Sequence, residues 1–86
     1  MNIHTTKTFT LTTSAEIADG DGLDLEELVA HAQLLESQST VQAPVPPGVL
    51  LRVAASSTHA RVRVAGGALP SGTVLTGVLS TVSARP

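Results

Sequence analysis

The amino-acid sequence predicts an α+β fold, in which one amphipathic helix packs on one face of an antiparallel sheet in the order β-α-β-β-β. Three observations lead to this prediction. Polar and apolar residues alternate near the N-terminus, apolar residues recur at helical spacing after residue 24, and two alternating segments follow a proline-rich stretch. The 86 residues suffice for a single domain, residues 1–86, with a small core.

The first expected element is a strand over residues 7–13. Threonine is β-branched and alternates here with Phe9 and Leu11, which we expect to point inward. Ile3 has the same parity and extends the apolar face toward the N-terminus.

The second expected element is a helix from about Leu25 to Glu36 or Ser37. Asp24 is a suitable N-cap, and Glu27 three residues later completes a capping box. The residues that fall on one face at spacings of three, four and seven are Leu25, Leu28, Val29, Ala32 and Leu35. Leu34 falls on the opposite, polar face of this helix.

The sequence of the remaining residues predicts strands separated by loops. Residues 38–48 are expected to form an extended, unpaired linker, because the prolines near its end cannot donate ladder hydrogen bonds. Residues 49–56 and 60–65 alternate about a short polar turn, which indicates a β-hairpin. A loop over 66–72, a last strand over 73–82 and a tail over 83–86 follow.

A two-residue turn at Ser57-Thr58 fixes the register of this hairpin. It places Arg52 opposite Arg63 and Ala54 opposite Arg61 on one face, and leaves the other face wholly apolar. The turn lacks glycine and asparagine, so a four-residue loop is the alternative. The residues of the polar face, which are the candidate partner-binding residues, are Arg52, His59, Arg61 and Arg63.

The charges are divided unevenly along the chain. All seven acidic residues lie in residues 1–43, whereas four of the five basic residues lie in residues 44–86. Two arginines directly opposite each other destabilise a sheet, so we expect something to neutralise them. The alternatives are the acidic segment of this chain or of a second copy, solvent, an acidic protein surface, and nucleic acid.

Several kinds of chemical site are disfavoured. The chain has no cysteine, and its single aromatic residue, Phe9, leaves no platform for stacking nucleic-acid bases. Residues 67–73 space two glycines and a hydroxyl like a phosphate-binding loop but lack its lysine, and residues 19–24 lack the later oxygen ligands of a calcium loop. No two of His4, His31 and His59 have a metal-ligand spacing. We therefore expect no catalytic, cofactor or metal site, and no enzyme.

Three segments carry a resemblance to known proteins: residues 7–11, 24–28 and 49–53. Their outline of strand, capped helix and basic hairpin, with the bias toward alanine, valine, glycine and arginine, resembles small accessory proteins of bacteriophages that infect high-GC, actinobacterial hosts. The resemblance spans about residues 7–65, contains no diagnostic motif and implies no activity.

The resulting functional prediction is a non-enzymatic protein–protein interaction module, regulatory or structural and phage-encoded. Apolar residues that one helix cannot cover indicate a homodimer or higher homo-oligomer, and a host or virion protein with an acidic surface is a further expected partner. The alternative is a nucleic-acid-binding β-ribbon that uses Arg52, Arg61 and Arg63. Neither a secretion signal nor a membrane-spanning stretch is evident, so the expected location is the host cytoplasm or the virion.

Overall fold

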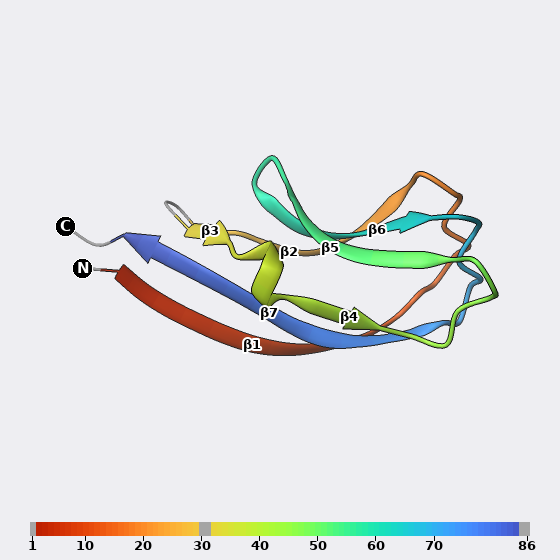
Figure 1. The fold of residues 1–86 in the computed structure, drawn as a ribbon, viewed down its shortest axis with the longest axis horizontal. Coiled ribbons are helices and arrows are strands. Elements are labelled where there is room, and N and C mark those ends of the chain that lie inside the picture. The colour runs from red at the N-terminus through yellow and green to blue at the C-terminus, as the bar shows by residue number, and fades with distance from the viewer. Residues whose placement is uncertain (1, 30–31, 85–86) are drawn as a thin grey trace.

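Two antiparallel sheets, each built around one central strand, form the molecule (Figure 1). The structure is a computed structural model and describes residues 2–29 and 32–84. In the first sheet, β7 (Val74–Ala84) lies between β1 (Asn2–Thr12) on one side and the short strands β3 (Ala32–Leu34) and β4 (Thr40–Gln42) on the other. In the second sheet, β6 (His59–Ala65) lies between β2 (Gly22–Glu27) and β5 (Leu50–Ser56).

The segments β3 and β4 behave as one strand with an interruption. Both pair with β7, and a short 3-10 helix, η1 (Glu36–Gln38), leaves the sheet between them. The ladder continues past this excursion, because the Leu35 N–H donates to the carbonyl of Ser80 at 2.8 Å. The Ser80 N–H in turn donates to the Ser39 hydroxyl at 3.0 Å. Ser80 is therefore buried with its backbone groups satisfied.

The predicted α+β class is wrong, because the described residues form an almost entirely β structure without an amphipathic helix. The segment predicted as helical forms β2, β3 and η1 instead. The physical reason is a β-bulge between Asp24 and Glu26, which shifts the register of β2 against β6 by one residue. Leu23, Leu25 and Leu28 thus all pack on the core, and this broken alternation imitates helical spacing.

Two residues show how the predicted helical face fails. Val29, expected on the apolar face, is 72% exposed. Leu34, expected on the polar face, packs against the buried cluster that contains Leu79. Residues 30 and 31, which fall within the predicted helix, lie outside the described residues.

The prediction of an unpaired linker over residues 38–48 is also wrong in part. Its first half contains β4, in which Val41 pairs with Gly77 and packs against both buried clusters. Within this range, the segment after Gln42 is free of ladder pairing, because its prolines cannot donate ladder hydrogen bonds. The segment ends in a turn in which Gly48 has a φ of 88°.

The remaining strand predictions are confirmed. β1 includes the expected strand up to Thr12 and extends it through Ile3 to Asn2. β7 begins at Val74, one residue after the expected start, and continues through part of the expected tail to Ala84. The hairpin of β5 and β6 has the predicted register, in which Arg52 pairs with Arg63 and Val53 with Val62. The two-residue turn is real, with Ser57 at a φ of 55°.

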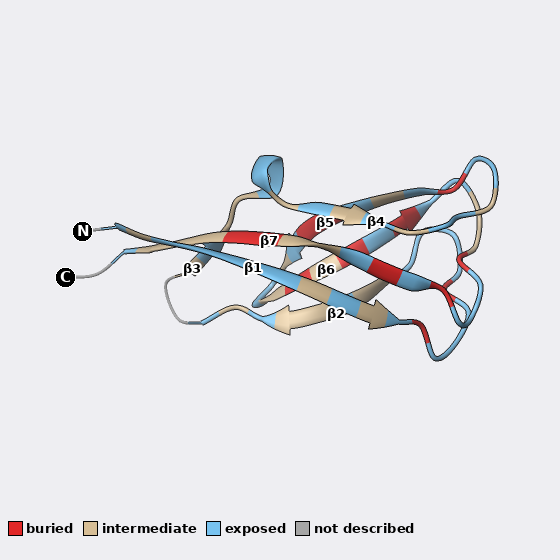
Figure 2. Ribbon diagram, turned by 90° about the horizontal axis from the view of Figure 1, so that it is seen from below, coloured by how far each residue is buried: buried red, intermediate tan, exposed pale blue. Residues whose placement is uncertain are grey.

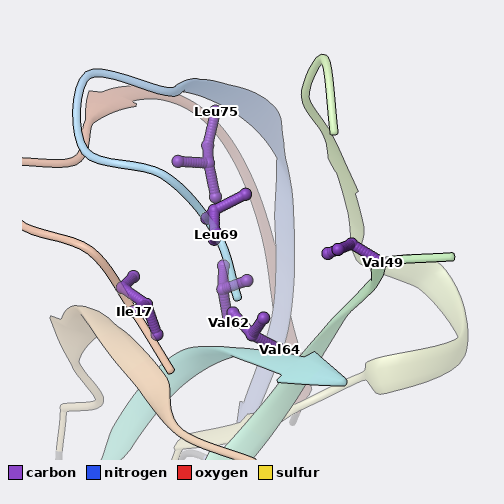
Figure 3. Packing of buried hydrophobic residues seen from close by; sticks show 6 residues of the cluster. All are labelled: Ile17, Val49, Val62, Val64, Leu69 and Leu75. Carbon is purple, nitrogen blue, oxygen red and sulfur yellow. The ribbon is translucent and has the colours of Figure 1, made fainter. Parts of the chain in front are cut away.

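The core lies between the two sheets and is built from small aliphatic side chains (Figure 2). The larger cluster occupies the end where the loops connect the sheets, and Figure 3 shows Leu69 between Leu75 and the valines of β6. The residues of this cluster are Ile17, Val49, Val62, Val64, Leu69 and Leu75. A second cluster of Val53, Ala60 and Leu79 lies farther along the sheets.

The two ends of the molecule differ. At the loop end, an isolated antiparallel bridge between Ile17 and Leu69 joins the β1–β2 loop to the β6–β7 loop, both of which run from one sheet to the other. The Thr13 hydroxyl there donates to the Pro70 carbonyl at 2.9 Å. At the other end, β1 and β7 project together, and the molecule measures 45 × 21 × 20 Å (Figure 1). Within residues 2–29 and 32–84, no helix has the length and apolar character needed to cross a membrane.

Candidate functional site: an arginine face on the second sheet

The candidate residues lie together on the outer face of the second sheet. The confirmed hairpin register puts the side chains of Val53, Val62 and Val64 toward the core, so the alternate positions of β5 and β6 face outward. We call these outward residues, namely Arg52, His59, Arg61 and Arg63, the arginine face.

Arg61 is neutralised within the chain. Its Nε lies 2.8 Å from the carboxylate of Asp24. The two residues are direct cross-strand partners, Asp24 on β2 and Arg61 on β6. The buried Nε makes no hydrogen bond, so the contact is an ion pair without hydrogen-bond geometry. Of the alternatives, contact with the acidic half of this chain is thus observed for Arg61, which is not one of the two opposed arginines. Because both side chains are more than a third exposed, the pair stabilises the fold by about 1 kcal/mol at most.

Gly22 makes room for this arrangement. It pairs with Arg63 on β6, and a Cβ atom at Gly22 would lie 2.6 Å from the Val62 carbonyl oxygen and 3.5 Å from Nη2 of Arg61. The Arg61 guanidinium therefore extends along β2, across the position that a side chain at Gly22 would need.

Arg52 and Arg63 are placed differently. They pair directly with each other across β5 and β6, and both are exposed. No ion pair in residues 2–29 and 32–84 includes either of them. Opposed like charges on a sheet are destabilising. The fold thus retains an unfavourable pair of charges where a partner can approach.

An exposed leucine adjoins this pair. Leu50 is 69% exposed and lies on the same face of β5 as Arg52, two residues away. Sequence reasoning missed Leu50 as part of a site, because it assigned surplus apolar surface to oligomerisation in general. It also missed the pairing role of Asp24, which it assigned to a helix N-cap.

The rim of the arginine face carries carboxylates. Glu27 pairs with His59 at the end of β2, and the Thr58 hydroxyl lies 3.3 Å from Nδ1 of His59. Glu36 on η1 accepts a hydrogen bond from the Ala55 N–H at 3.0 Å. The outer face therefore combines two free arginines with acidic neighbours, a mixed arrangement that does not favour a polyanion.

The other sequence features have structural roles. Asp19, in the segment tested as a calcium loop, accepts a hydrogen bond from the Gly66 N–H at 3.1 Å. Among the described residues, no group of three or more histidine, cysteine or carboxylate side chains is arranged to hold a metal. The loop over residues 66–72 contributes the buried Leu69 to the core.

A cavity of about 240 Å³ lies at the projecting end, between β1, β7 and the end of β2. Its wall includes the ion pair of Lys7 with Glu26, 3.3 Å apart, and the side chains of Leu28 and Leu79. This lining is mixed in character, because carboxylate, hydroxyl and lysine side chains lie beside aliphatic ones.

Comparisons with known protein families, with curated proteins and with solved structures find no match for this chain. The residues themselves therefore carry the functional argument.

Proposed function

We propose that this protein is a non-enzymatic protein–protein interaction module, phage-encoded and self-associating, that binds an acidic protein surface through Arg52 and Arg63 of its arginine face. The observation that supports the proposal is the opposed pair of Arg52 and Arg63, which has no acidic neighbour in ion-pair contact among the described residues. Exposed Leu50 beside Arg52 adds the apolar contact that protein interfaces commonly combine with arginine.

The rim favours a protein over a nucleic acid. Asp24 and Glu27 lie on the same sheet as the arginines and would repel a run of phosphates. An acidic protein surface can place single carboxylates on Arg52 and Arg63 while avoiding the rim. Arginine also offers carboxylates a bidentate geometry.

Quantitative capture tests the proposed partner. Wild-type protein and the variants Arg52→Gln/Arg63→Gln and Lys7→Gln/Arg61→Gln serve as baits in an actinobacterial host lysate, with bound proteins measured by mass spectrometry. Both variants lose two positive charges, but only the first removes the free arginines. We expect acidic prey proteins to be lost from the first variant alone. An unchanged set of prey on that variant contradicts the proposal.

The β-ribbon alternative rests on the same exposed hairpin, because a two-stranded ribbon can enter a DNA major groove. Fluorescence anisotropy with a labelled duplex distinguishes the two functions. A nucleic-acid function predicts binding at low salt that weakens steeply as the salt concentration rises. The proposed function predicts no retention on the duplex at low salt.

A further inference from the structure

The outer edge of β1 differs from the other edges of the two sheets. Natural proteins protect edge strands with charge, shortness or covering segments. β2 has three carboxylates in six residues, and the Ala55 N–H of β5 is bonded to Glu36. β1 has eleven residues, of which Lys7 is the only lysine, arginine or carboxylate residue.

The hydrogen-bonding pattern shows which residues of β1 have free backbone groups. The N–H and carbonyl of Ser80 point toward the β3–β4 side of β7. Because these directions alternate along a strand, Leu79 and Thr81 point toward β1 instead. Their partners Lys7 and Thr5, and the other odd-numbered residues of β1, therefore use their backbone groups on β7.

The even-numbered residues consequently direct their N–H and C=O groups away from the sheet. We call this row the threonine edge: Asn2, His4, Thr6, Thr8, Thr10 and Thr12. All six are exposed. No backbone hydrogen bond to another segment uses them within the described part of the chain. Their side chains share the outer face of the first sheet, opposite to the face of the core residue Leu75.

We propose that the threonine edge pairs with the same edge of a second copy, antiparallel about a two-fold axis. Such pairing would join two four-stranded sheets into one continuous sheet. Each of its side-chain pairs near the axis would include at least one β-branched residue, threonine or isoleucine, and such residues stabilise neighbouring strands. The inference rests on the proposed function only for the expectation of self-association and does not involve the arginine face.

Charge and space select the register. An axis at Lys7 would place two lysines opposite each other, which is unfavourable. An axis at Thr6 pairs Phe9 with Ile3 of the second copy and Thr8 with His4 of the second copy. Lys7 then faces a threonine and keeps its contact with Glu26. The contact between Lys7 and Glu26 places β2 beside the C-terminal half of β1 (Figure 2). In an antiparallel pair about Thr6, the C-terminal halves of the two β1 strands point in opposite directions, so the two β2 strands stay apart.

Light scattering with a proline variant tests the pairing. Wild-type protein should have the mass of a dimer at micromolar concentration. Thr6→Pro removes the outward N–H without removing a bond to β7, so the monomer should retain its fold. Because two hydrogen bonds across the axis are lost, the dimer dissociation constant should rise roughly 10- to 100-fold. Thr6→Val, which keeps the N–H, should remain dimeric.

Single cysteines test the register, since the chain has no cysteine of its own. Under mild oxidation Thr6→Cys should form a disulfide-linked dimer, because residues paired at the axis lie about 5.5 Å apart, within the range for a disulfide. Thr8→Cys and Thr10→Cys should not form this link. In the proposed register, residue 8 lies about 14 Å along the strand from residue 8 of the second copy, and residue 10 lies about 27 Å from residue 10 of the second copy.

The outcomes separate the claims. A wild-type monomer or trimer overturns the two-fold pairing, and a monomer also removes self-association from the proposed function. A dimer that neither responds to Thr6→Pro nor links through Thr6→Cys overturns the threonine edge alone. Loss of capture by Arg52→Gln/Arg63→Gln is a separate result and depends on neither.

Discussion

At the scale of single residues, the clearest constraint lies at Gly77. This residue pairs with Phe9 on one side of β7 and Val41 on the other. A Cβ atom here would overlap the Thr40 carbonyl oxygen and would lie 2.8 Å from Cζ of Phe9. The only aromatic ring of the chain therefore covers a glycine, and a side chain at position 77 would collide with both neighbouring strands.

Gly77→Ala should lower the free energy of unfolding by about 1–3 kcal/mol, because the new methyl group must displace backbone as well as the ring. Urea denaturation at a fixed protein concentration measures the change. Thr76→Val, on the exposed face of the same strand, should alter the free energy by about 0.5 kcal/mol or less. Equal effects of the two substitutions would contradict the close approach.

A second residue-scale prediction concerns the opposed arginines. Arg52→Glu replaces a repulsive cross-strand pair by an attractive one, so the free energy of unfolding should rise by a few tenths to about 1 kcal/mol. Thermal denaturation at low salt measures the gain, which added salt should reduce. In an Arg63→Ala background the gain should disappear. A gain of the same size in both backgrounds would show that the two arginines do not interact.

At the scale of elements, β2 shows how a bulge alters the pattern that the sequence presents. Leu25 packs against both buried clusters, whereas Val29 is 72% exposed. On a helix the two residues would have shared one apolar face. Their different burial is a direct consequence of the register shift between Asp24 and Glu26.

Leu25→Ala should therefore lower the free energy of unfolding by about 1–2 kcal/mol, and Val29→Ala should change it by about 0.5 kcal/mol or less. The same urea titration, performed on both variants at matched concentration, compares them. Similar losses at both positions would support an amphipathic helix over residues 25–37 and contradict β2.

The predictable parts of the fold share one property, which is an unbroken period of two. The hairpin and β1 keep this period, so the sequence alone predicts their faces and the Arg52–Arg63 pair. The sequence predicts β7 as a strand but not which face is buried, because valines and leucines lie on both of its faces. β2 and β4 could not be predicted in the same way. A bulge breaks the alternation in β2, and β4 is a strand only because β7, more than thirty residues later, supplies its hydrogen bonds. The pairing of Asp24 with Arg61 depends on that same long-range contact.

At the scale of the whole molecule, the loop end holds the sheets together. Leu69 lies in a loop by sequence but is fully buried between the sheets (Figure 3). Leu69→Ala should lower the free energy of unfolding by about 2–5 kcal/mol, as for a core leucine. Leu50→Ala removes the same atoms from an exposed position and should leave stability within about 0.5 kcal/mol. Comparable losses would place Leu69 outside the core.

The central position of β7 also determines when the first sheet can form. β1, β3 and β4 hydrogen-bond to β7 and not to one another, so they have no partner until residues 74–84 have left the ribosome. The β5–β6 hairpin, by contrast, closes through a two-residue turn and can form earlier. A growing chain therefore presents the threonine-rich strand β1 before the strand that pairs with it, and unpaired strand edges of this kind are prone to associate with other chains during folding.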